Sequence, residues 1–178
     1  MQRLILNWRG PIDLQTFEKT QASSVSLDDP PNNRPVVYLW CIRIVRRGED
    51  GLAVNYVGST RQFQTRMRRH CQYWVNGKYS LFDPQDAVRG EINIRYIPRY
   101  DQWDSCFEQV ARADLSLIKV FWAEVEDKPK EVESALKLKL TRKQETRGYL
   151  YSQEQMTSKL HHDFIENRFP DRCRIIGF

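Results

Sequence analysis

Two neighbouring apolar runs constrain the fold of this chain more than any other feature. Residues 36–45 are β-branched or aromatic almost throughout, and residues 52–58 form a second run after a polar stretch that contains Asp50 and Gly51. Strand-like runs on either side of an Asp-Gly pair predict a β-hairpin with Asp50 and Gly51 in its turn. A third run, residues 117–125, predicts another strand.

Two further segments have the periodicity of amphipathic helices. The first is expected over 60–74, with Ser59 or Thr60 as its N-cap. Its apolar face is formed by Phe63, Met67, Cys71 and Trp74. The second is expected from Pro129 to about residue 146, because proline suits the first turn of a helix. Its apolar face is formed by Val132, Leu136 and Leu140.

The length of 178 residues suits one domain with a continuous apolar core. The longest apolar runs fall short of the roughly 20 residues that a membrane span needs, and the first residues lack the pattern of a signal peptide. We therefore expect a cytoplasmic protein with no membrane partner. Four widely spaced cysteines, which have no zinc-site spacing, are expected to be free thiols: Cys41, Cys71, Cys106 and Cys173.

The net positive charge is modest, but many of the cations lie close together in the segment after Gly58. The chain carries 28 Lys and Arg against 23 Asp and Glu, a net charge of +5, so the placement of the cations decides whether nucleic acid is a partner. A cationic helix follows Gly58, which is expected to let the backbone turn tightly before it. Arg66 and His70 are four residues apart on this helix and can reach the same phosphate. A solvated basic face is the alternative.

The residues around the two tyrosines resemble a known family. Val36-Val37-Tyr38 and Tyr56-Val57-Gly58, followed by Arg66, resemble the signature of the GIY-YIG nuclease superfamily, in particular its restriction-endonuclease-like members. The resemblance covers roughly residues 35–74 and 117–140. It implies that Tyr38 and Tyr56 are the two motif tyrosines, that Arg66 is the family's arginine, and that His70 is the histidine found one helical turn later in some members.

The resemblance also implies a glutamate that binds a divalent metal on the later helix. Glu133 fits best, and Glu131 is the alternative because a shift of two residues turns the carboxylate to another side of the helix. A single carboxylate suits Mg²⁺ or Mn²⁺ as the cofactor, since Mg²⁺ keeps most of its waters. Arg66 would hold the scissile phosphate. Tyr38 is assigned to the water and Tyr56 to the phosphate, or the reverse; either becomes a base only if nearby cations lower its pKa.

Together these patterns predict an α+β fold with a small, mainly antiparallel three-stranded sheet flanked by helices. The expected parts are an N-terminal extension (1–34), the tyrosine hairpin and arginine helix (35–74), an irregular insertion (75–115), the third strand and glutamate helix (116–147), and a C-terminal extension with weak helical periodicity (148–178). The predicted function is metal-dependent, sequence-specific double-strand cleavage of DNA. A structure- or single-strand-selective nuclease and a catalytically silent nucleic-acid-binding module are the alternatives.

The predicted site has two sets of residues. The catalytic set is Tyr38, Tyr56, Arg66, His70 and Glu133, and the DNA-binding set is Arg61, Arg68, Arg69, Lys137 and Lys143. Cations near the glutamate, which include Lys137 and Lys143, are expected to follow a DNA backbone, with a wet helix surface as the alternative. A homodimer is a further expectation, because two strands must be cut.

Overall fold

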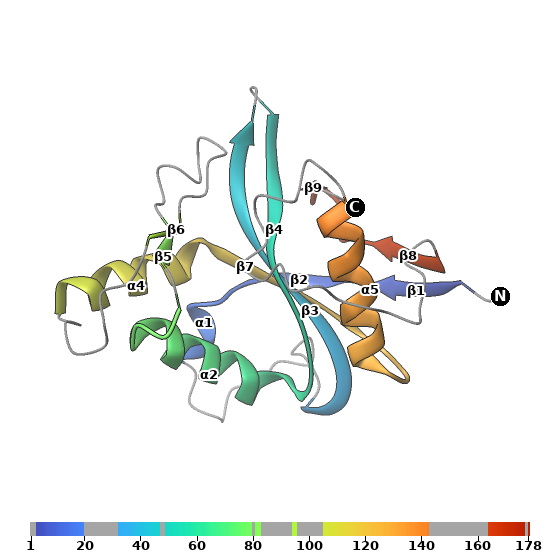
Figure 1. Ribbon diagram of the computed structural model, residues 1–178, viewed down its shortest axis with the longest axis horizontal. Coiled ribbons are helices and arrows are strands. Elements are labelled where there is room, and N and C mark those ends of the chain that lie inside the picture. The colour runs from blue at the N-terminus through green and yellow to red at the C-terminus, as the bar shows by residue number, and fades with distance from the viewer. Residues whose placement is uncertain are drawn as a thin grey trace.

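The computed structural model describes residues 3–19, 32–46, 49–79, 81–82, 94–95, 105–142, 164–176 and 178 (Figure 1). These residues form a curved sheet with helices on both of its faces. The elements are β1 (Leu4–Asn7), β2 (Arg9–Asp13), α1 (Thr16–Lys19), β3 (Asn32–Arg46), β4 (Glu49–Gln62), α2 (Phe63–Val75), β5 (Leu81–Phe82), β6 (Ile94–Arg95), α4 (Ser105–Leu117), β7 (Ile118–Glu124), α5 (Pro129–Arg142), β8 (Ile165–Arg168) and β9 (Ile175–Ile176).

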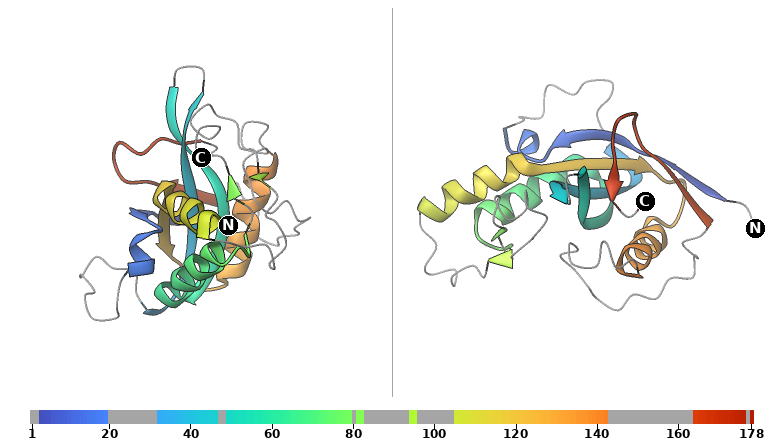
Figure 2. Two further views of the ribbon diagram at one scale, coloured as in Figure 1. Left: turned by 90° about the vertical axis from the view of Figure 1, so that its left-hand side faces the viewer. Right: turned by 90° about the horizontal axis from the view of Figure 1, so that it is seen from above.

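The main sheet has five strands in the order β2-β7-β3-β4-β9. Its central strand, β3, pairs antiparallel with β4 and with β7, while β9 pairs parallel with β4 over only two residues. Two small sheets join β1 to β8 and β5 to β6. In Figures 1 and 2, α2 and α4 lie at one end of the main sheet, and β1 and β8 lie at the other.

Strand β3 separates two apolar cores, because successive side chains of a strand point to opposite faces. Tyr38 and Trp40 belong to a core that also contains the buried residues of α2, whereas Val37 and Leu39 belong to a core that contains those of α5. A strand covered on both faces reads as a continuous apolar run, which explains why residues 36–45 lack alternation. The predicted apolar faces of both helices are buried.

The predicted three-stranded, mainly antiparallel sheet is wrong. The three predicted strands are neighbours, as β4, β3 and β7, but β2 and β9 extend the sheet on either side, and the parallel strand β9 makes it mixed. The added strands are short and come from opposite ends of the chain. Pairing between such distant segments leaves no local pattern in the sequence, so periodicity cannot reveal it.

Several local predictions also differ from the structure. Asp50 and Gly51 lie inside β4, where they pair with Val45 and Ile44, so they do not form the hairpin turn. Strand β4 continues to Gln62, which is the N-cap of α2, so neither Ser59 nor Thr60 caps this helix. Pairing with β3 holds residues 59–62 in the sheet and overrides their capping preference.

The two segments predicted to be irregular or weakly helical contain regular structure. The predicted insertion, 75–115, includes most of helix α4. The described part of the C-terminal extension, which has only weak helical periodicity in the sequence, contains strand β8, which pairs parallel with β1. Helix α5 ends at Arg142, and the rest of the predicted helix lies outside the described residues. In the part of the chain that the structure describes, no helix is long and apolar enough to cross a bilayer.

The thiols of Cys41, Cys71 and Cys173 are free, and the first two are buried. Burial raises the pKa of the Cys71 thiol to about 12. The side chain of Cys106 lies outside the described residues.

Candidate active site

Tyr38 lies at the centre of the candidate site. Its side chain is fully buried in the middle of β3, directly across from Gly58 in β4. A Cβ atom at position 58 would lie 2.4 Å from both Cζ and Oη of Tyr38. Gly58 is therefore explained by the space that the tyrosine ring needs. It lies in an extended strand, so the expectation that it forms a tight turn before the helix is wrong.

Helix α2 brings two polar side chains to the Tyr38 hydroxyl. Arg66 and His70 are one helical turn apart, so they project from the same side of the helix. The imidazole Nε2 of His70 lies 2.8 Å from Oη of Tyr38, and Nε of Arg66 donates a hydrogen bond to the same oxygen over 3.4 Å. On its other side, Nδ1 of His70 lies 2.6 Å from Oη of Tyr79, which follows the helix.

The site keeps both Tyr38 and His70 neutral. Burial, followed by the proximity of Tyr56, raises the pKa of Tyr38 well above its usual value, although Arg66 acts to lower it. Burial, with the charges of Arg66 and Arg69, lowers the pKa of His70 to about 3. The expectation that nearby cations would lower the pKa of a motif tyrosine is therefore not met at Tyr38, because desolvation outweighs the charge of Arg66.

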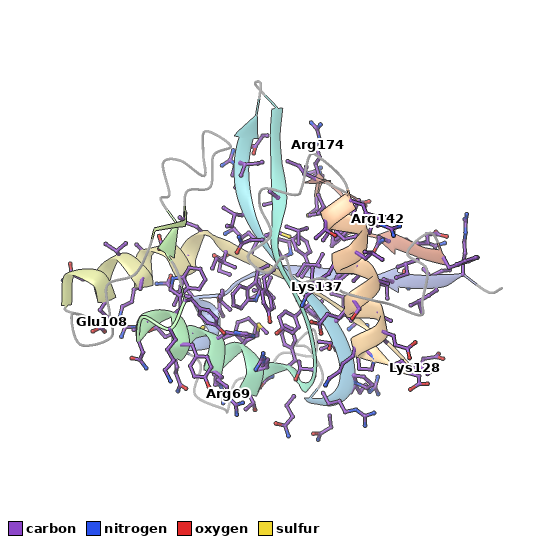
Figure 3. All side chains as sticks on the ribbon, viewed as in Figure 1. Arg69, Glu108, Lys128, Lys137, Arg142 and Arg174 are labelled. Carbon is purple, nitrogen blue, oxygen red and sulfur yellow. The ribbon has the colours of Figure 1, made fainter. Side chains whose placement is uncertain are left out.

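Helix α5 contributes a charged pair from the other side of β4. Glu133 accepts a hydrogen bond of 2.6 Å from the Ser59 hydroxyl and forms an ion pair of 2.8 Å with Lys137, one helical turn later. The ammonium group of Lys137 is also 5.7 Å from the centre of the Tyr56 ring. Figure 3 shows Lys137 on the side of α5 that faces the sheet. Glu131 instead pairs with Lys128 over 3.8 Å.

The two tyrosines join these helices into one cluster. The ring centroids of Tyr38 and Tyr56 are 6.0 Å apart, and Arg66 interacts electrostatically with both. The described part of β9 pairs only with Leu52 and Ala53, so among the described strands none covers the edge of β4 beside the cluster. The structure thus brings together the five residues of the predicted catalytic set: Tyr38, Tyr56, Arg66, His70 and Glu133.

The predicted DNA-binding residues have different environments. Arg61 and Arg69 are exposed and Arg68 is partly buried, so the end of β4 and helix α2 do present positive charge to solvent. Lys137 is buried, with 7% of its surface exposed, and its nearest charged partner is Glu133. The alternative interpretation, that Lys137 lies on the wet side of its helix, is therefore wrong. Lys143 lies outside the described residues.

Sequence reasoning missed two polar contributors. Ser59 was expected only as a helix cap, yet its hydroxyl holds Glu133, 74 residues away in the chain. Tyr79 belongs to neither predicted set of site residues, yet its hydroxyl group hydrogen-bonds His70. Its position after the end of α2 breaks the helical spacing, so no periodic signal connects it with His70.

The donor set fits a divalent cation held by one protein carboxylate. Glu133 is half-buried beside the tyrosines, and Mg²⁺ commonly uses one or two carboxylates with waters and phosphate oxygens as the other ligands. Within the described residues, no group of three His, Cys, Asp or Glu side chains forms an all-protein metal cage. The Lys137 ammonium lies against Oε1 of Glu133, so a cation bound there would compete with it.

A cavity of about 810 Å³ lies away from this cluster. It is lined by residues near the start of β1, by Arg34 and Pro35, and by the segment 124–127. It shares no residue with the tyrosine cluster, and one of the carboxylates that line it, Glu124, forms ion pairs with Arg9 and Arg34. The candidate catalytic residues therefore lie in the cluster and not around the cavity.

Comparison with known proteins gives no independent assignment. No known protein family matches the chain, and no curated protein or solved structure is significantly similar to it.

Proposed function

We propose that this protein is a metal-dependent endonuclease that hydrolyses DNA phosphodiester bonds, as a divergent member of the GIY-YIG superfamily. The observation that carries the proposal is the convergence of two tyrosines, an arginine, a histidine and a carboxylate from β3, β4, α2 and α5. The sequence resemblance assigns a catalytic role to these same residue types. A purely structural cluster would not need a cation, a carboxylate and two hydroxyl groups beside the edge of β4, which no described strand covers there.

Each residue has a role that phosphodiester hydrolysis requires. Arg66 carries N–H donors besides the Nε that binds Tyr38, and its planar guanidinium suits the two oxygens of a phosphate. Tyr38 takes up the proton of the attacking water as it passes its own hydroxyl proton to His70, and Tyr56 supports the phosphate. Glu133 would hold a divalent cation, which when bound would supply a Lewis acid for the charge that builds on the phosphate oxygens.

The surface around the cluster suits a long polyanion. Arg69 is exposed on one side of the cluster, and Arg142 is exposed at the end of α5 on the other side (Figure 3). Arg61, near the end of β4, is also exposed. Cations that flank a site on two sides hold the phosphates on either side of the cleaved bond. We therefore propose duplex DNA as the substrate. Sequence-specific, restriction-type double-strand cleavage is proposed as the reaction because the resemblance is to restriction-type members of the family.

The test is cleavage of supercoiled plasmid with Mg²⁺, beside lanes with EDTA and lanes with the variants Glu133→Gln and Arg66→Ala. We expect discrete fragments that are lost with EDTA and with both variants. DNA affinity should survive in Glu133→Gln and fall in Arg66→Ala, because the first residue serves the metal and the second the phosphate. Glu131→Gln is the matched control, since its carboxylate lies two positions away and pairs with Lys128.

Other outcomes select among the alternatives. Equal cleavage by Glu133→Gln and wild type would remove Glu133 from the site. Cleavage of flaps or single strands in preference to duplex would indicate a structure-selective nuclease. Binding without cleavage of plasmid, flap and single-stranded DNA would indicate a silent nucleic-acid-binding module.

A further inference from the structure

A continuous hydrogen-bonded chain leads from Tyr38 to Tyr79 through His70. Oη of Tyr38 lies 2.8 Å from Nε2, and Nδ1 lies 2.6 Å from Oη of Tyr79. Both nitrogens of one buried imidazole are thus occupied by hydroxyl groups. His70 is 1% exposed, while Tyr79 is only partly buried. The chain therefore runs from the interior of the cluster toward the surface.

The donors at the Tyr38 end determine which atom donates each hydrogen bond in this series. Arg66 donates to Oη of Tyr38, which leaves the tyrosine proton as the natural donor to Nε2 of His70. A neutral imidazole carries one proton, so a nitrogen that accepts at Nε2 must carry its proton at Nδ1. That proton then points at Tyr79, whose oxygen accepts it. A neutral imidazole is what this environment favours, since burial lowers the pKa of His70.

We propose that Tyr79 is a positioning residue that holds His70 in the Nδ1–H tautomer and forms the outer end of a proton path for Tyr38. This inference rests on the proposed function for its catalytic part and on the geometry alone for the tautomer. The path starts when a water gives a proton to Oη of Tyr38. The tyrosine passes its own proton to Nε2, Nδ1 passes its proton to Oη of Tyr79, and Tyr79 releases one proton toward solvent.

These proton transfers balance without a charged histidine. One proton leaves the water and one leaves Tyr79, so both tyrosines and the imidazole are neutral before and after the transfer. The imidazole ends in the Nε2–H tautomer and must regain the Nδ1–H tautomer before the next turnover. Such a path lets Tyr38 take up a proton although burial raises its pKa, because no free tyrosinate or imidazolium has to exist inside the buried cluster.

The aromatic surroundings support the assignment. His70 is enclosed by the rings of Trp40, Tyr56 and Tyr79, with centroids 4.6 to 5.8 Å away. These rings fix the plane of the imidazole, and among the described side chains the hydroxyl groups of Tyr38 and Tyr79 are its hydrogen-bond partners. The variant Tyr79→Phe keeps the ring and removes only the oxygen.

The first test is nitrogen-15 NMR of histidine-labelled protein near neutral pH, without metal or DNA. The chain has three histidines, so His70→Asn assigns the signals of His70. In wild type we expect a protonated, pyrrole-type Nδ1 and an unprotonated, pyridine-type Nε2. In Tyr79→Phe we expect the two types to exchange, because a buried N–H without an acceptor is unfavourable and Tyr38 can still accept from Nε2.

The control is Tyr73→Phe. The Tyr73 ring packs 6.1 Å from that of Tyr79, so this variant also removes a hydroxyl group from the same aromatic cluster. It should leave the tautomer of His70 unchanged. A wild-type Nε2–H tautomer, a doubly protonated imidazole, or an unchanged Nδ1–H tautomer in Tyr79→Phe would overturn the inference. Thermal melts of all variants establish that they are folded.

The second test measures cleavage and separates this inference from the proposed function. Tyr79→Phe should slow cleavage by roughly ten- to a hundredfold with unchanged DNA affinity, the scale of a lost proton-transfer group. Tyr73→Phe should cleave at the wild-type rate. Undiminished cleavage by Tyr79→Phe would overturn the proton path while leaving the nuclease intact. A wild type that holds the expected tautomer and cuts no DNA would instead refute the proposed function.

Discussion

Replacement of Gly58 by alanine is the sharpest test of how this cluster is built. The added Cβ would lie 2.4 Å from Cζ and Oη of Tyr38 and 2.9 Å from its Cε1. The ring is fully buried and packs against other rings, including Phe63 and Tyr56, which restrict its movement. The substitution therefore forces either the strand or the Tyr38 ring to shift.

The size of the effect can be worked out by comparison with Gly51. Both glycines are in β4, and neither has a positive φ. A Cβ at Gly51 meets only the side chain of Ile176, at 3.2 and 3.3 Å, and the main chain at 3.5 Å. Alanine gains roughly 0.5–1 kcal/mol over glycine inside a strand, whereas overpacking a core costs roughly 1–3 kcal/mol. We expect Gly58→Ala to lose about 1–2 kcal/mol and Gly51→Ala to change little.

Urea denaturation of wild type and both variants measures these differences, and thermal melts should show Gly58→Ala lowered by roughly 2–8 °C. Because the shift acts on Tyr38, the hydrogen bond to His70 should also weaken, and the nitrogen-15 shifts of His70 should change only in Gly58→Ala. If Gly58→Ala were as stable as Gly51→Ala and left the His70 signals in place, the close packing of Tyr38 against β4 would be refuted.

Two further predictions concern charge. The pKa of His70 is about 3 in the folded protein and about 6.5 in an unfolded chain, so between these pH values the unfolded chain binds more protons. The free energy of unfolding should fall as the pH drops from 6.5 toward 3, by up to about 1.4 kcal/mol per pH unit. Urea denaturation of His70→Asn over the same pH range should show a smaller pH dependence, because the contribution of His70 is missing. Lys137→Met removes the ammonium that lies 2.8 Å from Glu133, so Mn²⁺ should bind more tightly, by about tenfold if the ion pair contributes roughly 1.4 kcal/mol. Water-proton relaxation measures this affinity, with Lys139→Met as the control; unchanged Mn²⁺ affinity in Lys137→Met would show that the ammonium does not compete for Glu133.

Most of the main secondary structure could be predicted because its signals are local. The long apolar runs form β3, β4 and β7, and the four-residue spacings of Phe63, Met67 and Cys71 mark the buried face of α2. Strands β2 and β9 could not be predicted in the same way. Each is too short to have a periodicity of its own, and each becomes a strand only because β7 or β4 offers it an unpaired edge.

The candidate site shows the same division. Its five predicted catalytic residues were named from motif spacing and family resemblance, and in the structure they lie in one cluster. The roles of Gly58, Lys137 and Tyr79 required the tertiary structure. Gly58 accommodates a ring across the strand pair, Lys137 turns inward to Glu133, and Tyr79 reaches His70 from beyond the helix.

The sequence by itself determined the strands β3, β4 and β7, the helices α2 and α5, and the side chains that we propose for a phosphate site. The tertiary structure decided the number and direction of the strands, and it decided the protonation states, because desolvation depends on what surrounds a group. The charge of Arg66 alone favours an ionised Tyr38, but burial in the assembled core outweighs it and keeps the hydroxyl protonated. Burial of this kind is set by segments far apart in the chain, so no local pattern records it.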